Sequence, residues 1–190
     1  MRRYELLKSI TPLLTDDAFV ICNLGFPSQE LYSLRDSDHH FYMLGSMGLS
    51  SSIGLGLSME IDNTVIAIDG DGSVLMNLGT LSTIALEDSK NFILFIVDNG
   101  SYGSTGDQPT HTAKGTSLAA IAKAAGIASS VEVAGADAAD KLAQCMKTPG
   151  PHVIVAKVEP GSPAMTPIPL TSLAIRDRFR EAVKVAKAKA

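Results

Sequence analysis

Runs of apolar residues recur along the chain and are separated by segments with helical patterning. Four of them are strand-sized: residues 18–23 (AFVICN), 64–69 (TVIAID), 91–98 (NFILFIVD) and 152–158 (HVIVAKV). Because these runs are apolar almost throughout, they predict strands buried on both faces, as in a parallel sheet covered by helices. A shorter run at residues 130–133 predicts a fifth strand.

The intervening segments predict helices over residues 5–14, 28–34, 45–59, 74–86, 118–125, 136–146 and 172–190. Ser28 is expected to cap the second of them. Residues 35–40 are expected to form a polar loop, and the proline-rich segment 160–169 is expected to cross a surface. Strands that alternate with helices predict one α/β domain over residues 1–190, a doubly wound, mostly parallel sheet flanked by helices, with a C-terminal helix.

Two polar, glycine-rich turns follow two of the predicted strands. They are residues 69–73 (DGDGS) and 98–103 (DNGSYG), and 25 residues separate Gly72 from Asp98. That gap holds one helix and one strand, so the crossover brings the two turns side by side. In doubly wound sheets, ligands bind beyond the carboxyl ends of the strands. The two turns are therefore the candidate site.

The two turns offer oxygen ligands suited to magnesium. Asp71 supplies a carboxylate, Asn99 a side-chain carbonyl and Ser101 a backbone carbonyl. Mg²⁺ takes six oxygens and commonly completes its shell with phosphate and water. The amides of Gly72 and Ser73 begin a helix, and a helix N-terminus favours an anion. The alternative is that both segments are ordinary turns of an α/β domain.

The motif GDGS followed at this spacing by DNGSYG resembles the signature of thiamine diphosphate (ThDP) enzymes. That signature is GDG and then a pair of asparagines; here Asp98 replaces the first asparagine, and Asn99, the metal ligand in the family, is present. The resemblance implies the ThDP-binding fold, the cofactors ThDP and Mg²⁺, and a metal held by Asp71, Asn99 and Ser101.

A second stretch, Gly45-Ser46-Met47-Gly48, resembles the family's segment that holds the thiamine rings. The resemblance implies that the Gly45 carbonyl accepts from the aminopyrimidine and that Met47 is wedged between the rings. Otherwise Met47 is a core residue at a glycine-rich helix start, and Gly25 is a plain turn glycine. The implied cofactor contacts are Gly25, Gly45, Ser46, Met47, Gly70, Asp71, Gly72, Ser73, Asn99, Ser101, Tyr102 and Gly103.

The family's cofactor lies between two domains, and residues 1–160 resemble only the one that binds diphosphate and metal. The other domain supplies an activating glutamate, and none of the seven glutamates of this chain has that context. We therefore assign no catalytic residue here and expect a partner chain that carries the pyrimidine-binding domain. The small residues Gly48, Ser52 and Gly56 suit a tight contact with such a partner, or packing within the domain equally well.

Three longer segments, NLGFPSQELYSL, FYMLGSMGLSSSIGLGL and DNGSYGSTGDQPTHT, resemble small decarboxylases of 3-sulfopyruvate and 3-phosphonopyruvate. The short chain is similar to the beta subunits of two-chain sulfopyruvate decarboxylases of coenzyme M biosynthesis, which form sulfoacetaldehyde. The alternatives are a phosphonopyruvate decarboxylase, another split 2-oxo acid decarboxylase or acetolactate synthase-like subunit, and a non-catalytic regulatory subunit.

An anionic substrate needs hydrogen-bond donors, and several polar residues follow the second turn. The candidates are Ser104, Thr105, Gln108, Thr110, His111 and Thr112, unless they form a solvated loop. His39 and His40 precede the ring-binding stretch and are weaker candidates for proton transfer. His152 is expected to be structural.

Bulk properties narrow the class. The net charge of −4 argues against a nucleic-acid surface. We find no segment resembling a signal peptide and no run of the ~18 apolar residues that a membrane span needs. Cys22 and Cys145 are expected to be buried, reduced thiols, which favours a cytoplasmic location. The basic C-terminal segment is expected to be a solvated helix face.

Overall fold

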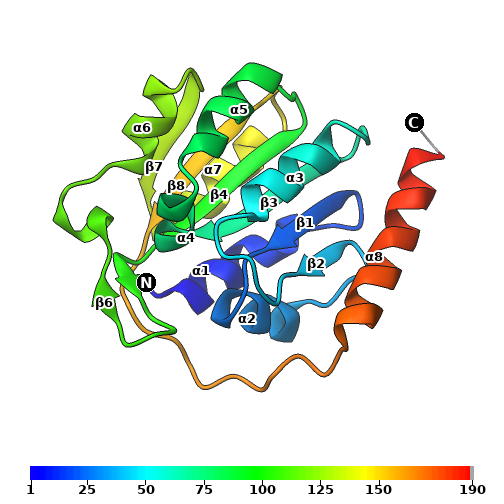
Figure 1. Ribbon diagram of the computed structural model, residues 1–190, viewed down its shortest axis with the longest axis horizontal. Coiled ribbons are helices and arrows are strands. Elements are labelled where there is room, and N and C mark those ends of the chain that lie inside the picture. Colours follow the sequence, from blue (N-terminus) through cyan, green and yellow to red (C-terminus); the bar gives the residue numbers. More distant parts are fainter. Residues whose placement is uncertain (189–190) are drawn as a thin grey trace.

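The computed structural model describes residues 1–188, and it is built on one six-stranded parallel sheet (Figure 1). The strands are β1 (Ala18–Cys22), β2 (His40–Tyr42), β3 (Thr64–Gly70), β4 (Phe92–Asp98), β7 (Ser129–Ala134) and β8 (His152–Lys157), in the order β2-β1-β3-β4-β8-β7. All neighbouring strands in this sheet are parallel. The predicted α/β fold with a parallel sheet is confirmed.

Helices cover both faces of the sheet. One face packs against α1 (Arg3–Ile10), α2 (Phe26–Leu34) and α7 (Ala138–Cys145). The other packs against α3 (Ser50–Ser58), α4 (Asp71–Met76), α5 (Gly79–Glu87) and α6 (Leu118–Ala124). The C-terminal helix α8 (Ser172–Lys187) lies beside the edge strand β2 (Figure 1). The strands that feed the site are thus held between two apolar layers.

Close packing of α3 on the sheet depends on one glycine. A Cβ atom at Gly54 would lie 2.9 Å from Cε2 of Phe92 and 3.1 Å from Cβ of Ala67. The absence of that atom lets the helix backbone rest directly on β3 and β4. The core around this contact is mainly aliphatic, as the low aromatic content indicates.

Three local predictions were wrong. The helix expected from residue 45 begins only at Ser50, because Gly48, with φ of +93°, cannot continue an α-helix. The single helix expected over residues 74–86 is two helices, α4 and α5, that part at Asn77. Ser28 is not a cap, because α2 already begins at Phe26 and the buried Ser28 hydroxyl donates to the carbonyl of Asn23 at 2.8 Å.

The edge strand β2 was also missed. Its residues alternate between a buried and a half-buried environment, since α8 covers one side of it. Arg178 of α8 donates from both terminal guanidinium nitrogens to the Asp36 carboxylate, at 2.8 and 2.6 Å. Arg178 is thus held against the loop before β2, whereas Arg176, Arg180, Lys184 and Lys187 are exposed, as the expected solvated helix face requires. The prediction for residues 189–190 lies outside the described residues.

Cys22 and Cys145 are both buried and unpaired, as predicted, and burial raises the pKa of the Cys22 thiol to about 12. Within residues 1–188, none of the helices combines the length and the apolar character needed to cross a bilayer.

Candidate active site

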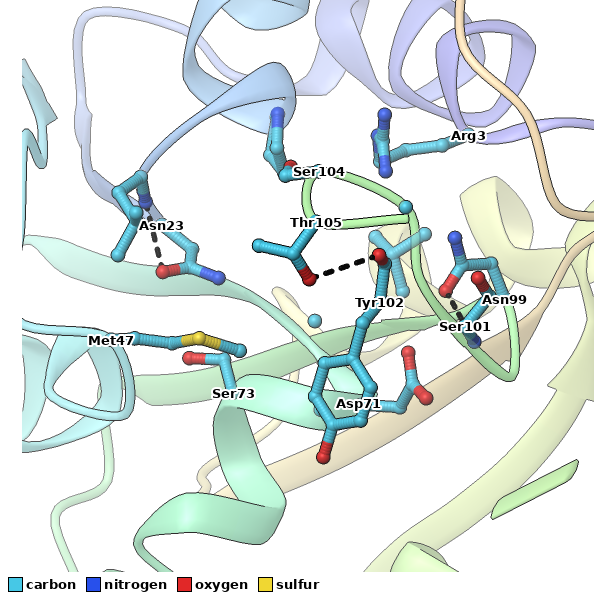
Figure 2. Close-up of a pocket in the computed structure, with 16 residues that line it drawn as sticks. Arg3, Asn23, Met47, Asp71, Ser73, Asn99, Ser101, Tyr102, Ser104 and Thr105 are labelled. Atoms are coloured by element: carbon cyan, nitrogen blue, oxygen red, sulfur yellow. Dashed lines mark hydrogen bonds between the residues drawn. The ribbon is translucent and has the colours of Figure 1, made fainter. Parts of the chain in front are cut away.

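The site lies at the carboxyl edge of the sheet, where β1 has β2 on one side and β3 on the other. This is the point at which the strand order reverses, and it is where doubly wound sheets place their ligands. A hollow of about 700 Å³, including space open to solvent, lies there. It is lined by Arg3, Asn23, Leu24, Pro27, Met47, Gly70, Asp71, Gly72, Ser73, Val97, Asn99, Ser101, Tyr102, Gly103, Ser104 and Thr105 (Figure 2).

The three predicted metal ligands all line this hollow. Asp71 is the first residue of α4, directly after β3, whereas Asn99 and Ser101 follow β4. The Asn99 side-chain oxygen accepts from the Ser101 amide at 3.1 Å, which folds the second turn back on itself (Figure 2). Two strands that are neighbours in the sheet therefore deliver the ligands, as the crossover predicts.

Two threonine hydroxyls form a hydrogen-bonded network with the Asp71 carboxylate. Thr110 donates to Oδ2 of Asp71, while the Thr112 hydroxyl lies 3.0 Å from that oxygen and 2.8 Å from Oδ1 of Asp98. A hydroxyl has one proton, so Thr112 donates to one carboxylate at a time. Lys157 neutralises Asp98 with an ammonium–carboxylate distance of 2.8 Å. Asp98, the departure from the family pattern, is thus buried and paired.

Burial is the largest influence on Asp71 and raises the pKa of its carboxyl, while hydrogen bonds from Thr110 and Thr112 oppose that rise. The donor set fits a metal that arrives with a ligand. Among the described residues, no three His, Cys, Asp or Glu side chains gather into a metal cluster. One carboxylate and two neutral oxygens hold Mg²⁺ only when other oxygens, such as those of a diphosphate, complete its shell.

The loop that carries Met47 is fastened to both the sheet and α4. The Gly48 amide donates to the Ser73 hydroxyl at 2.8 Å, and the Asn77 side chain donates to the Gly48 carbonyl at 2.9 Å. Ser50 donates to Asp69 at the end of β3. Met47 consequently lines the hollow at the side opposite Asn99 (Figure 2).

Tyr102 packs directly on the first turn of α4. A Cβ atom at Gly72 would lie 2.4 Å from Cε1 of Tyr102, a distance that real side chains do not tolerate. Gly72 is therefore required so that the second turn can close over the first.

The structure brings most of the predicted cofactor residues together. Nine of the twelve line the hollow, whereas Gly25, Gly45 and Ser46 do not. Gly25 lies just outside it with φ of +80°, where an added Cβ atom would be 3.4 Å from the Ser104 hydroxyl. The positive φ explains why a glycine occupies this turn.

Several lining residues were missed from the sequence. They are Arg3, Asn23, Leu24, Pro27 and Val97. Asn23 carried a usable signal, since it directly follows β1 at the same sheet edge as Asp71. Arg3 carried none, because it reaches the hollow from the start of α1 through tertiary packing.

The candidate substrate donors separate into two groups. Ser104 and Thr105 line the hollow, and Gln108 and His111 are exposed outside it. Thr110 and Thr112 are buried and committed to carboxylates, so they are not free to reach a substrate.

All four histidines fall within residues 1–188, and none of them lines the hollow. His39 stacks on Phe19 at 4.3 Å between ring centroids, and His40 is buried against Tyr42. His152 is buried and bonded to Ser129, in agreement with a structural role.

Residues 24–156 match the family model described as thiamine pyrophosphate enzyme, C-terminal TPP binding domain. The matched region contains every residue predicted to contact the cofactor. Thiamine pyrophosphate is another name for ThDP.

The chain is also similar to proteins named sulfopyruvate decarboxylase subunit beta. It is 43% identical to that of Methanocaldococcus jannaschii, over 96% of this chain and 97% of the relative. It is 46% identical to that of Methanococcus maripaludis, over 97% and 98%. A sulfopyruvate decarboxylase of Methanosarcina acetivorans is 42% identical over 90% of this chain, but over only 45% of its own length.

Among solved structures, benzoylformate decarboxylase from Polynucleobacter necessarius has the same fold. It superposes with a TM-score of 0.65 at 18% identity, over 84% of this chain and 33% of its own. The matched domain, the full-length relatives and the shared fold agree, and the chain therefore belongs to the thiamine pyrophosphate enzymes as a bearer of their C-terminal, TPP-binding domain.

Proposed function

We propose that this chain is the beta subunit of a sulfopyruvate decarboxylase, which converts 3-sulfopyruvate to sulfoacetaldehyde and CO₂ in coenzyme M biosynthesis. The observation that carries the proposal is coverage in both directions. The similarity to two beta subunits extends over 96–97% of this chain and 97–98% of theirs.

In this proposal, Asp71, Asn99 and the Ser101 carbonyl hold Mg²⁺ on the diphosphate. The amides of Gly72 and Ser73 face the diphosphate oxygens, and Met47 supports the thiamine rings. When bound, ThDP supplies the electron sink that a 2-oxo acid needs to lose CO₂. The protein residues position that group, exclude water and hold the charge of the diphosphate.

The site calls for a second chain. All seven glutamates fall within the described residues, and none of them lines the hollow. The activating glutamate of the family is therefore expected on an alpha subunit with the pyrimidine-binding domain. The longer M. acetivorans relative, less than half of which matches this chain, supports a missing half.

Exposed apolar side chains around the Met47 loop support the same partner. Leu44, Leu49 and Ile53 flank the loop with exposed fractions of 62%, 42% and 38%, and Met76 is 63% exposed. Met76 lies beside the loop, since an added Cβ atom at Gly48 would be 3.5 Å from its Cβ. Exposed apolar side chains gathered near one loop are typical of a protein contact.

The test is substrate competition on the native complex purified through this chain. We expect ThDP-dependent release of CO₂ from sulfopyruvate, with phosphonopyruvate and pyruvate turned over far more slowly. Preferred turnover of phosphonopyruvate or another 2-oxo acid would replace the substrate and keep the decarboxylase. Turnover of none of them by a ThDP-loaded complex would favour a regulatory subunit.

A further inference from the structure

Arg3 is a cation at the wall of the hollow. It is the only Lys or Arg among the lining residues within the described part of the chain. The segment after β8 fixes the start of the chain beside the site: the Glu159 amide donates to the Met1 carbonyl at 2.9 Å, and Arg3 donates to the Ser162 hydroxyl. These contacts hold Arg3 in a defined position although it lies near the start of the chain.

Its guanidinium group is oriented by a buried partner. Nε lies 2.7 Å from Oε2 of Glu30 and Nη2 lies 2.9 Å from Oε1, and Glu30 is fully buried. The guanidinium carbon is 5.9 Å from the centre of the Phe26 ring. These contacts use one edge of the planar group. Within residues 1–188, Nη1 has no hydrogen-bond partner, and its two donors remain for a ligand.

The negative charge around the hollow would be balanced in part by the Arg3 guanidinium group. Asp71 and Asp98 are both carboxylates at this edge, and Lys157 is already paired with Asp98. A diphosphate brings further negative charge that one divalent cation does not fully offset. Arginine suits this role because its planar, fixed donors match phosphate oxygens.

The position of Arg3 in the hollow indicates which part of a bound ThDP it would contact. Figure 2 shows Arg3 toward the Asn99 side of the hollow and well away from Met47, where the proposal places the thiamine rings. We infer that Arg3, through Nη1, binds the distal phosphate of ThDP, with Glu30 as the residue that orients it. This inference rests on the proposed function and adds a diphosphate contact outside the metal-binding motif.

The experiment compares ThDP with thiamine monophosphate, which lacks the distal phosphate. Calorimetry on the two-chain complex with Mg²⁺ gives both dissociation constants. The double variant Arg3→Gln/Glu30→Gln removes both charges and so avoids leaving a buried glutamate unpaired. We expect roughly 10–100-fold weaker ThDP binding, the scale of a lost charged hydrogen bond, with monophosphate binding unchanged.

Two further variants make the result decisive. Arg2→Gln removes a neighbouring arginine that does not line the hollow, and both affinities should stay at the wild-type level. Arg3→Lys keeps the charge beside Glu30 but lacks the guanidinium group, and it should also weaken ThDP binding without affecting thiamine monophosphate. This variant carries the test if the double variant fails to fold. Unchanged ThDP affinity in the Arg3 variants, or an equal loss for both ligands, would overturn the inference. A wild-type complex that binds no ThDP would instead overturn the proposed function.

Discussion

At the scale of single residues, two neighbouring carboxylates of the site, Asp71 and Asp98, have different partners. Asp71 lines the hollow and is the carboxylate proposed to bind the metal, whereas Asp98 is paired with Lys157. Thr112 lies between them, within hydrogen-bond distance of both. We propose that Thr112 is a positioning residue, because hydrogen bonds to a metal-binding carboxylate would orient it.

Thr112→Val tests that positioning role. The substitution keeps the shape and removes the hydroxyl that Asp71 and Asp98 share, while the hydrogen bond from Thr110 to Asp71 remains. We expect roughly tenfold weaker Mg²⁺-dependent ThDP binding, in line with outer-sphere substitutions that cost ~10–100-fold in metal affinity. Calorimetry at several Mg²⁺ concentrations measures it, with the half-buried Thr116→Val as the control. Unaltered Mg²⁺ dependence in Thr112→Val would show that Asp71 needs no such support.

The residues found from the sequence are those that follow strands in short motifs. Asp71 and Asn99 were predictable because strand ends and their turns are local features. Arg3 and the commitment of Thr110 and Thr112 to carboxylates were not, since they arise only when segments distant in sequence pack together. Thr110 and Thr112, two of the predicted substrate donors, instead form hydrogen bonds with the carboxylates of Asp71 and Asp98.

At the scale of elements, α3 shows why glycines in one helix have different roles. Gly54 faces the sheet, where an added Cβ would press on Phe92, whereas Gly56 is exposed with open space around it. Gly48 precedes the helix altogether. The three small residues suggested as a contact face, Gly48, Ser52 and Gly56, therefore do not share one environment.

Alanine substitutions at the two helical glycines should have opposite effects. Gly54→Ala is expected to destabilise the protein by about 1–3 kcal/mol through overpacking. Gly56→Ala should stabilise it by roughly 0.5–1 kcal/mol, because alanine loses less backbone freedom in a helix. Denaturant titration of each variant measures both. Equal effects would contradict the packing of α3, and a Gly56→Ala protein that is stable but associates poorly would place a partner on that residue.

The buried strands were predictable and the edge strand was not. β3, β4 and β8 are nearly continuous apolar runs, and that pattern marks them in the sequence. β2 has three residues: His40 and Tyr42 are buried, and Phe41 between them packs against Phe179 of α8. The helix that packs on this strand, α8, begins at Ser172, about 130 residues later. Packing against so distant a segment leaves no hydrophobic pattern in the local sequence.

The same edge predicts a pH dependence of stability. Burial is the main cause that lowers the pKa of His40 from 6.5 to about 4; the charges of Arg35 and Arg178 add to it, whereas a hydrogen bond to the Arg35 backbone and the charge of Asp36 oppose it. Between those values the unfolded chain binds a proton that the folded protein does not, so stability falls as the pH drops. The full effect is about 3 kcal/mol at most.

His40→Gln should flatten the decline in unfolding free energy between pH 6.5 and pH 4, measured by denaturant titration. The exposed His111→Gln is the control and should leave the slope unchanged. Other titrating groups cancel in this comparison, including Asp69, whose pKa is raised to about 6 by burial and whose effect has the opposite sign. An unaltered slope in His40→Gln would mean that His40 is protonated in the folded protein.

At the scale of the whole molecule, a parallel sheet gathers the turns after β1, β3 and β4 at one edge, and the Met47 loop and the first residues of the chain close around them. The result is one wall of a cofactor site. Asn99, a proposed metal ligand, lies opposite Met47, the proposed contact of the rings (Figure 2), and within residues 1–188 none of the lining residues is a glutamate. The opposite wall is expected from the partner.

Reconstitution tests this account most directly. The chain and the chain that co-purifies with it would be separated, assayed alone with ThDP, Mg²⁺ and sulfopyruvate, and assayed again after mixing. We predict no turnover by either chain alone and restored turnover on mixing, lost again when the mixed chain carries Asp71→Ala. Decarboxylation by this chain alone would contradict the divided site, because it would place all the catalytic groups on one subunit.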